Sequence, residues 1–70
     1  MTKRVGLAML RAKYDLTQEQ IAERCGVKKA TYCLIEQGKR NGTLAFWQTV
    51  QREFALTDAQ VWSLQNGKSL

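Results

Sequence analysis

Residues 16–36 contain the sequence LTQEQIAERCGVKKATYCLIE, and we expect this stretch to decide the fold. Thr17 and Gln20 have the spacing of a capping box, in which two side chains satisfy unpaired backbone amides at the start of a helix. Gly26 is expected to end that helix, because glycine supplies the backbone freedom that a sharp turn needs. A second helix is expected to begin at about Lys28. The stretch therefore predicts two short helices that meet at a tight turn.

Further helices are expected on both sides of this pair. Apolar residues recur at helical spacing before it and after it, and Thr43 and Thr57 are positioned to cap two later helices. The chain has no proline and only five glycines, which favours helices joined by short turns. The expected helices cover about residues 2–13, 17–25, 28–37, 44–54 and 58–65. The sequence therefore predicts an all-α fold, a compact bundle of about five short helices in one domain over residues 1–70, with residues 66–70 as a candidate flexible tail.

The spacing of apolar residues supports the first helix and indicates which side chains of the later helices form the core. In the first helix the residues at helical spacing are Val5, Leu7, Leu10 and Tyr14. The fourth helix is expected to bury a stripe of Leu44, Trp47, Val50 and Phe54. Tyr32 and Ile35 are expected to attach the third helix to the body, and Trp62 is also expected in the core. For Phe46 the sequence leaves two positions open, one in the core and one exposed at a contact between two copies of the chain.

The positive charge of the chain is concentrated in its first part. The formal net charge is +5. Residues 1–43 hold nine Lys or Arg against four acids, whereas residues 44–70 hold two of each. This asymmetry suits a surface that faces phosphate, although a charge of this size also fits ordinary solubility. Lys3 and Arg4 are expected to be solvated, with a phosphate contact as the alternative.

The composition disfavours several classes of protein. There is no histidine, and the only cysteines are Cys25 and Cys33, so two reduced thiols are expected and no metal site, with a redox switch at Cys33 as an alternative. The sequence shows no pair of nucleophile and base, so we expect neither an enzyme nor a bound cofactor or small molecule. No apolar run reaches the roughly 18 residues of a membrane span, and no signal peptide is evident. We therefore expect a cytoplasmic protein that does not bind membranes.

Helix geometry predicts which face of the third helix points outward. At about 100° per residue, Tyr32 and Ile35 lie on the inner side. The opposite side carries Lys29, Ala30, Cys33 and Leu34, and Lys28 can extend its long side chain outward from the start of the helix. A face that is basic at its start and apolar beyond suits guanine acceptors and thymine methyl groups in a major groove.

Over about residues 5–65, the chain resembles the phage repressor and Cro (XRE-type) family of helix-turn-helix regulators. The matching pieces, in order, are Leu10-Arg11, residues 16–22, Gly26-Val27, Thr31, Ile35-Glu36, residues 38–40 and the helix from Leu44 to Leu56. The resemblance implies a lambda-repressor-like fold with its helix-turn-helix core at residues 17–36. It also implies a sequence-specific regulator of transcription in a bacterial or phage-infected cell. Such a regulator binds double-stranded operator DNA as a homodimer, with its third helix in the major groove.

The resemblance also implies roles for single residues. The residues expected to read DNA bases are Lys28, Lys29, Ala30 and Leu34, with Lys28 near the backbone or the first base. The expected phosphate contacts are Thr17, Gln18, Lys39, Arg40 and Asn41. Arg11 and Glu36 are expected to form a charged pair that joins the first helix to the end of the third. Lys28 stands where the family usually has a Ser or Thr cap, and Leu34 stands where a polar residue is common. Contact with thymine methyl groups is therefore expected to carry much of the readout.

A protein-interaction module with the same fold is the alternative function. An antitoxin-like protein or an adaptor would bind its partner through the last two helices, around Phe46 and Trp62. It would co-purify with that partner and would not be retained on DNA.

Overall fold

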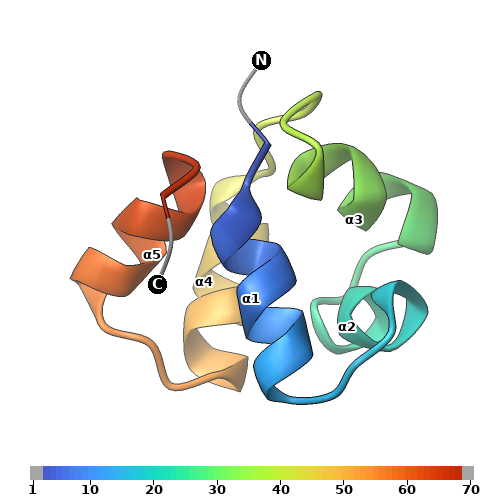
Figure 1. Ribbon diagram of the computed structural model, residues 1–70, viewed down its shortest axis with the longest axis horizontal. Coiled ribbons are helices and arrows are strands. Elements are labelled where there is room, and N and C mark those ends of the chain that lie inside the picture. The colour runs from blue at the N-terminus through green and yellow to red at the C-terminus, as the bar shows by residue number, and fades with distance from the viewer. Residues whose placement is uncertain (1–2, 69–70) are drawn as a thin grey trace.

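The computed structural model describes residues 3–68, which form five α-helices and no strand (Figure 1). The helices are α1 (Val5–Lys13), α2 (Gln18–Arg24), α3 (Lys29–Glu36), α4 (Leu44–Glu53) and α5 (Asp58–Gln65). They pack into a nearly round body of 26 × 25 × 22 Å. The all-α prediction is therefore confirmed, with each of the last four helices within about two residues of its expected bounds.

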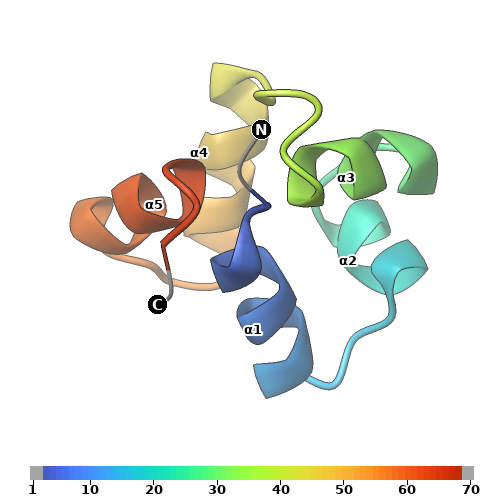
Figure 2. The same cartoon turned by 45° about the horizontal axis from the view of Figure 1, so that its top comes forward.

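Helix α1 occupies the middle of the molecule. In both views, α2 and α3 lie on one side of it and α4 and α5 on the other (Figures 1 and 2). Helix α1 packs against both α3 and α5, while α2 packs against α3 and α4 against α5. This arrangement leaves α3 at the edge of the body, with one face buried and one free.

Local side-chain hydrogen bonds explain where three helices begin. At α2, the amide of Gln20 donates to the Thr17 hydroxyl at 3.1 Å, and the Thr17 amide donates to the Gln20 side chain at 2.9 Å. Thr57 and Gln60 form a second capping box at α5. The Thr43 hydroxyl accepts from the backbone of α4. The capping box and the two threonine caps expected from the sequence are thus confirmed.

The first helix starts later than the sequence suggested. It begins at Val5, and the expected start at Thr2 lies outside the described residues. Arg4 directly before it is not helical, because its backbone amide donates to the carbonyl of Glu36 at 2.8 Å. The chain therefore enters α1 from the end of α3.

The core is made by one face of each helix. It contains Leu7, Leu10, Ile21, Ala22, Cys25, Tyr32, Ile35, Phe46, Trp47, Val50, Phe54, Val61 and Leu64. Leu16, Val27 and Leu56 are partly buried against this cluster. Tyr32 and Ile35 are both in it, which confirms how α3 is attached to the body.

Two expectations about α4 and α5 are wrong, those for Leu44 and Trp62. Leu44, the first residue of α4, is 74% exposed. Phe46, for which a core and an exposed position were both open, is buried, and its ring centre lies 4.9 Å from that of Trp47 in an edge-to-face arrangement. Trp62 is 53% exposed, because it lies about 130° around α5 from the direction of the buried Val61 and Leu64.

Backbone hydrogen bonds fix the chain directly after α5. Asn66 caps α5, and the amides of Gly67 and Lys68 donate to the carbonyls of Leu64 and Ser63. Of the expected tail, residues 69 and 70 lie outside the described residues. None of the helices described here is long and apolar enough to cross a bilayer.

Candidate nucleic-acid interface

The outer face of α3 is the first part of the candidate site. Lys28, Lys29 and Ala30 are exposed, and Cys33 and Leu34 are partly exposed. The opposite face is fixed, because Tyr32, Ile35 and Glu36 are buried. The structure thus brings the four residues expected to read bases together on one free surface, at the edge of the molecule (Figures 1 and 2).

The start of α3 has no side-chain cap. Lys28 takes the N-cap position in an extended conformation, and its side chain makes no capping hydrogen bond. The turn before it is supported instead by Gly26, whose φ of 73° suits glycine, and by the Val27 amide, which donates to Ala22 at 3.0 Å. The first turn of α3 therefore presents backbone amides and two lysines, Lys28 and Lys29, to solvent.

The N-terminal end of α2 lies next to the start of α3. Thr17, Gln18 and Lys29 line one hollow, together with Arg11 and Glu19. Thr17 is exposed, and its hydroxyl oxygen already accepts a hydrogen bond in the capping box. The hydroxyl proton is still free to be donated to an acceptor such as phosphate.

The loop from Lys39 to Asn41 forms the other border of the site. All three residues are exposed, and the backbone under them is fixed. The amides of Lys39 and Arg40 donate to the carbonyl of Leu34 at 2.9 and 3.2 Å, and the indole N–H of Trp47 donates to the Asn41 carbonyl at 2.9 Å. The loop therefore has an ordered backbone and free cationic side chains.

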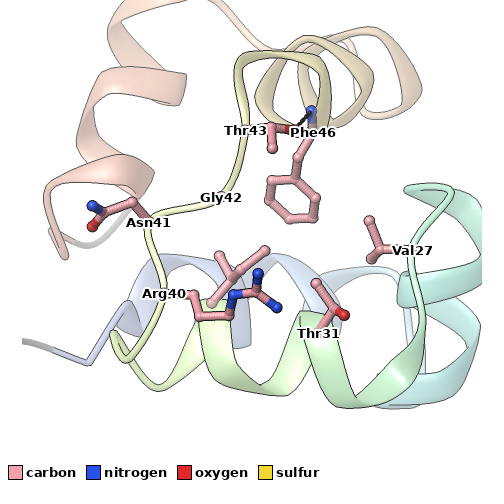
Figure 3. A pocket seen from close by; sticks show the side chains of 8 residues that line it. Val27, Thr31, Arg40, Asn41, Gly42, Thr43 and Phe46 are labelled. Carbon is pink, nitrogen blue, oxygen red and sulfur yellow. Dashed lines mark hydrogen bonds between the residues drawn. The ribbon is translucent and has the colours of Figure 1, made fainter.

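A hollow between this loop, α3 and α4 adds a residue to the site. Arg40, Thr31 and Phe46 are among the side chains that line it. In Figure 3 the Arg40 guanidinium points across the hollow toward Thr31, while the Asn41 side chain points away. Sequence reasoning used Thr31 only as a mark of resemblance. Its nearness to Arg40 depends on the course of the loop, which no local pattern shows.

Arg4 corrects another expectation, because it is neither solvated nor free for phosphate. It is 7% exposed, and its guanidinium donates to the carbonyls of Ile35, Arg40 and Gln65 at 2.6, 2.8 and 3.1 Å. Burial lowers the pKa of this guanidinium from its ordinary value of 12.5. The group still carries its charge at neutral pH, since arginine is not deprotonated in proteins.

The charged pair implied by the resemblance is present. Nη2 of Arg11 lies 3.2 Å from Oε1 of Glu36, and the Glu36 side chain is almost fully buried. This contact joins α1 to the last turn of α3. It ties the third helix to the first.

Both cysteines are free thiols. Burial, together with the nearby carboxylate of Glu53, raises the pKa of Cys25 from 9.0 to about 11, so this thiol stays protonated at neutral pH. Within residues 3–68, no three His, Cys, Asp or Glu side chains lie close enough to hold a metal ion.

Comparison with known proteins gives independent information. Residues 5–61 match a family described as "Helix-turn-helix domain". Two similar proteins from Archaeoglobus fulgidus are each named "Uncharacterized HTH-type transcriptional regulator". Each is 37% identical over 51 residues, which are 73% of this chain and 72% or 73% of the relative. No solved structure gives a significant match.

The family match covers the first four helices and the beginning of α5. It includes the capping box of α2, the turn at Gly26 and the whole of α3, which together form the two short helices and tight turn described above. The chain therefore belongs to the helix-turn-helix domain family.

Proposed function

We propose that the chain is a sequence-specific regulator of transcription, of the phage repressor or Cro type, that binds double-stranded operator DNA through α3. The observation that carries the proposal is the first turn of α3. It is exposed and basic at Lys28 and Lys29, while Tyr32 and Ile35 on its other side are buried. A helix held in this way offers its N-terminal residues to base edges in a major groove.

In the proposed complex, the exposed face of α3 reads bases by two kinds of contact. Lys29 donates to the O6 and N7 acceptors of a guanine, and Lys28 lies near the first base or the backbone. Ala30 and Leu34 contact thymine methyl groups. Half of this face is apolar. Contact with thymine methyl groups therefore carries part of the discrimination between base pairs that hydrogen bonds usually provide.

Phosphate contacts on both sides of α3 set its position in the groove. Thr17 and Gln18 bind one phosphate at the start of α2, and Lys39, Arg40 and Asn41 bind others from the loop. These contacts supply most of the affinity and make it depend on salt.

The proposed assembly is a homodimer on a pseudo-palindromic operator. Its two copies of α3 enter major grooves about 34 Å apart, one helical turn of DNA. The protein acts in the cytoplasm of a bacterial or phage-infected cell and has no enzymatic step.

The alternative, a partner-binding module, relied on two exposed residues, Phe46 and Trp62, and only one of them is exposed. Phe46 is 3% exposed, so it cannot form part of a surface for a partner. Of these two residues, only Trp62 is exposed. DNA binding is the function that the free face of α3 favours.

Selection of bound DNA from a random pool tests the proposal. The expected result is a palindromic consensus whose half-sites are about 10 base pairs apart. Binding to that consensus is then measured across salt concentrations, where the logarithm of affinity should fall steeply and linearly. Failure to enrich any sequence, or an affinity that does not change with salt, would overturn the proposal.

A further inference from the structure

Arg4 lies where three segments of the chain meet. Its Nη1 donates to the carbonyls of Ile35 and Arg40 at 2.6 and 2.8 Å, and its Nε donates to the carbonyl of Gln65 at 3.1 Å. Its Cζ lies 5.5 Å from the centre of the Trp47 ring. One side chain thus joins the end of α3, the loop after it and the end of α5.

The partners of Arg4 are backbone carbonyls. The ion pairs formed within residues 3–68 are Arg11 with Glu36 and Arg24 with Glu53, so neither includes Arg4. The carbonyls of Ile35 and Gln65 belong to the last turns of α3 and α5, where the partial negative charge of a helix stabilises a cation. Three good acceptors and an aromatic ring compensate for the burial of this charge.

The loop carbonyl held by Arg4 belongs to Arg40, directly after the two cations of the loop. Arg40 accepts from Arg4, and the next carbonyl, that of Asn41, accepts from Trp47. The carbonyls of Arg40 and Asn41 are therefore both turned inward. Their donors, Arg4 and Trp47, also contact each other. With the backbone fixed on its inner side, the Lys39 side chain stays exposed and the Arg40 guanidinium extends over the hollow toward Thr31.

We propose that Arg4 is a positioning residue for DNA binding, which holds the Arg40 carbonyl against the ends of α3 and α5 and so orients the Lys39–Asn41 loop toward phosphate. The inference rests on the proposed function of that loop. It gives a role to a residue that does not itself reach the DNA surface. A guanidinium fits this role because its five N–H donors lie in a rigid fork, which an ammonium does not offer.

The test combines Arg4→Met with a double-mutant cycle on DNA affinity, measured on the operator found by selection. We expect Arg4→Met to weaken binding about tenfold on operator and unrelated DNA alike, since loop contacts carry no sequence information. In a background in which Lys39, Arg40 and Asn41 are all replaced by alanine, the same change should weaken binding less than about twofold. In a Lys29→Ala background, it should keep its full effect. An equal loss in all three backgrounds would mean that Arg4 acts only on general stability, and would overturn the proposal.

Amide hydrogen exchange in the DNA-free protein provides a second measurement. In Arg4→Lys, which keeps the charge but not the fork, the amides of Lys39 and Arg40 should exchange at least about tenfold faster. The amide of Cys25, the C-cap of α2, should not change. Equal acceleration at all three amides, or no acceleration in the loop, would overturn the proposal, as would failure of both Arg4 variants to fold. If the wild-type chain bound no DNA, the proposed function would fail, and the proposed DNA role of Arg4 would fail with it. The exchange data would still decide whether Arg4 holds the loop.

Discussion

Arg11 reaches from α1 to Glu36 in the last turn of α3, and Nη2 of the arginine lies 3.2 Å from Oε1 of the carboxylate. The two ends of this contact differ in burial, since the Arg11 side chain is 28% exposed and that of Glu36 only 4%. The carboxylate is therefore the member of the pair that depends on its partner. Any change that removes the guanidinium leaves a negative charge inside the protein.

Arg11→Met is expected to lower the free energy of unfolding by about 3–5 kcal/mol, because it leaves the buried Glu36 carboxylate without its cation. Guanidinium chloride denaturation measures the loss. Arg24→Met is the matched control, since Arg24 pairs with Glu53 at 3.6 Å on the surface. That pair should contribute about 1 kcal/mol or less. Equal losses in the two variants would contradict the burial argument.

Lys28→Ser is expected to separate stability from DNA binding. The serine hydroxyl can cap α3, which has no side-chain cap, and should stabilise the protein by about 1 kcal/mol relative to Lys28→Ala. Both variants lose the lysine charge, so they should weaken DNA binding to the same extent. Thermal unfolding and binding titrations give the two quantities. A Lys28→Ala variant that binds DNA as tightly as wild type would exclude Lys28 from the interface.

Gly6→Ala should be destabilising, although alanine usually favours a helix by up to about 1 kcal/mol over glycine. A Cβ at Gly6 would lie 2.5 Å from Cδ2 of Leu64 and 2.6 Å from the Lys68 carbonyl, so α1 and α5 would have to separate. We expect a loss of about 1–3 kcal/mol in chemical denaturation. The control is Ala12→Gly at an exposed position of α1, where the ordinary preference for alanine should hold. A stabilised Gly6→Ala protein would show that the contact of α1 with α5 is loose.

Leu34 gives a direct test of methyl readout. Replacing the contacted thymine by uracil removes only the methyl group, and should weaken binding of the wild-type protein measurably at that position. The same replacement should have no effect on binding by Leu34→Ala. Equal sensitivity to uracil in wild type and Leu34→Ala would remove Leu34 from the reading face.

Lys29→Ala should lose about 1–3 kcal/mol of discrimination at a guanine, measured by binding titrations on operators changed at that base pair.

Stability should fall in alkaline solution. Burial raises the pKa of Cys25 from 9.0 to about 11, and burial followed by the charge of Glu36 raises that of Tyr32 above 10.0. Above about pH 9 the unfolded chain releases protons that the folded chain keeps, so the free energy of unfolding decreases with increasing pH. Denaturation at pH 8 and pH 10 measures the effect. Cys25→Ala should reduce the slope, and a slope that persists in full would assign it to other groups.

Local features of the sequence predicted much of the fold. Thr17 and Gln20 form their capping box within one turn, so no distant residue is needed to foresee it. The free face of α3 followed in the same way from the angle between successive residues, because Tyr32 and Ile35 had to face inward. The pairing of Arg11 with Glu36 came from family resemblance instead, and it is present in the structure.

Long-range contacts were beyond the reach of sequence reasoning. The acceptors of Arg4 lie 31, 36 and 61 positions away, so its burial depends on the packing of three separate segments. Helical spacing predicts Trp62 in the core, but α5 packs through Val61 and Leu64, and Trp62 faces outward. Ala55, with a φ of 51°, takes a left-handed conformation that alanine does not favour. No local sequence pattern predicts it.

The hydrogen bond from Arg4 to the carbonyl of Gln65 spans 61 positions of the chain, and it sets an order of events during synthesis. The helix that supplies this carbonyl is made after the other four, so Arg4 is synthesised well before its third acceptor. Until residue 65 has left the ribosome, the guanidinium has only two of its three acceptors. The contact that joins α3, the loop and α5 is therefore complete only after α5 has been made.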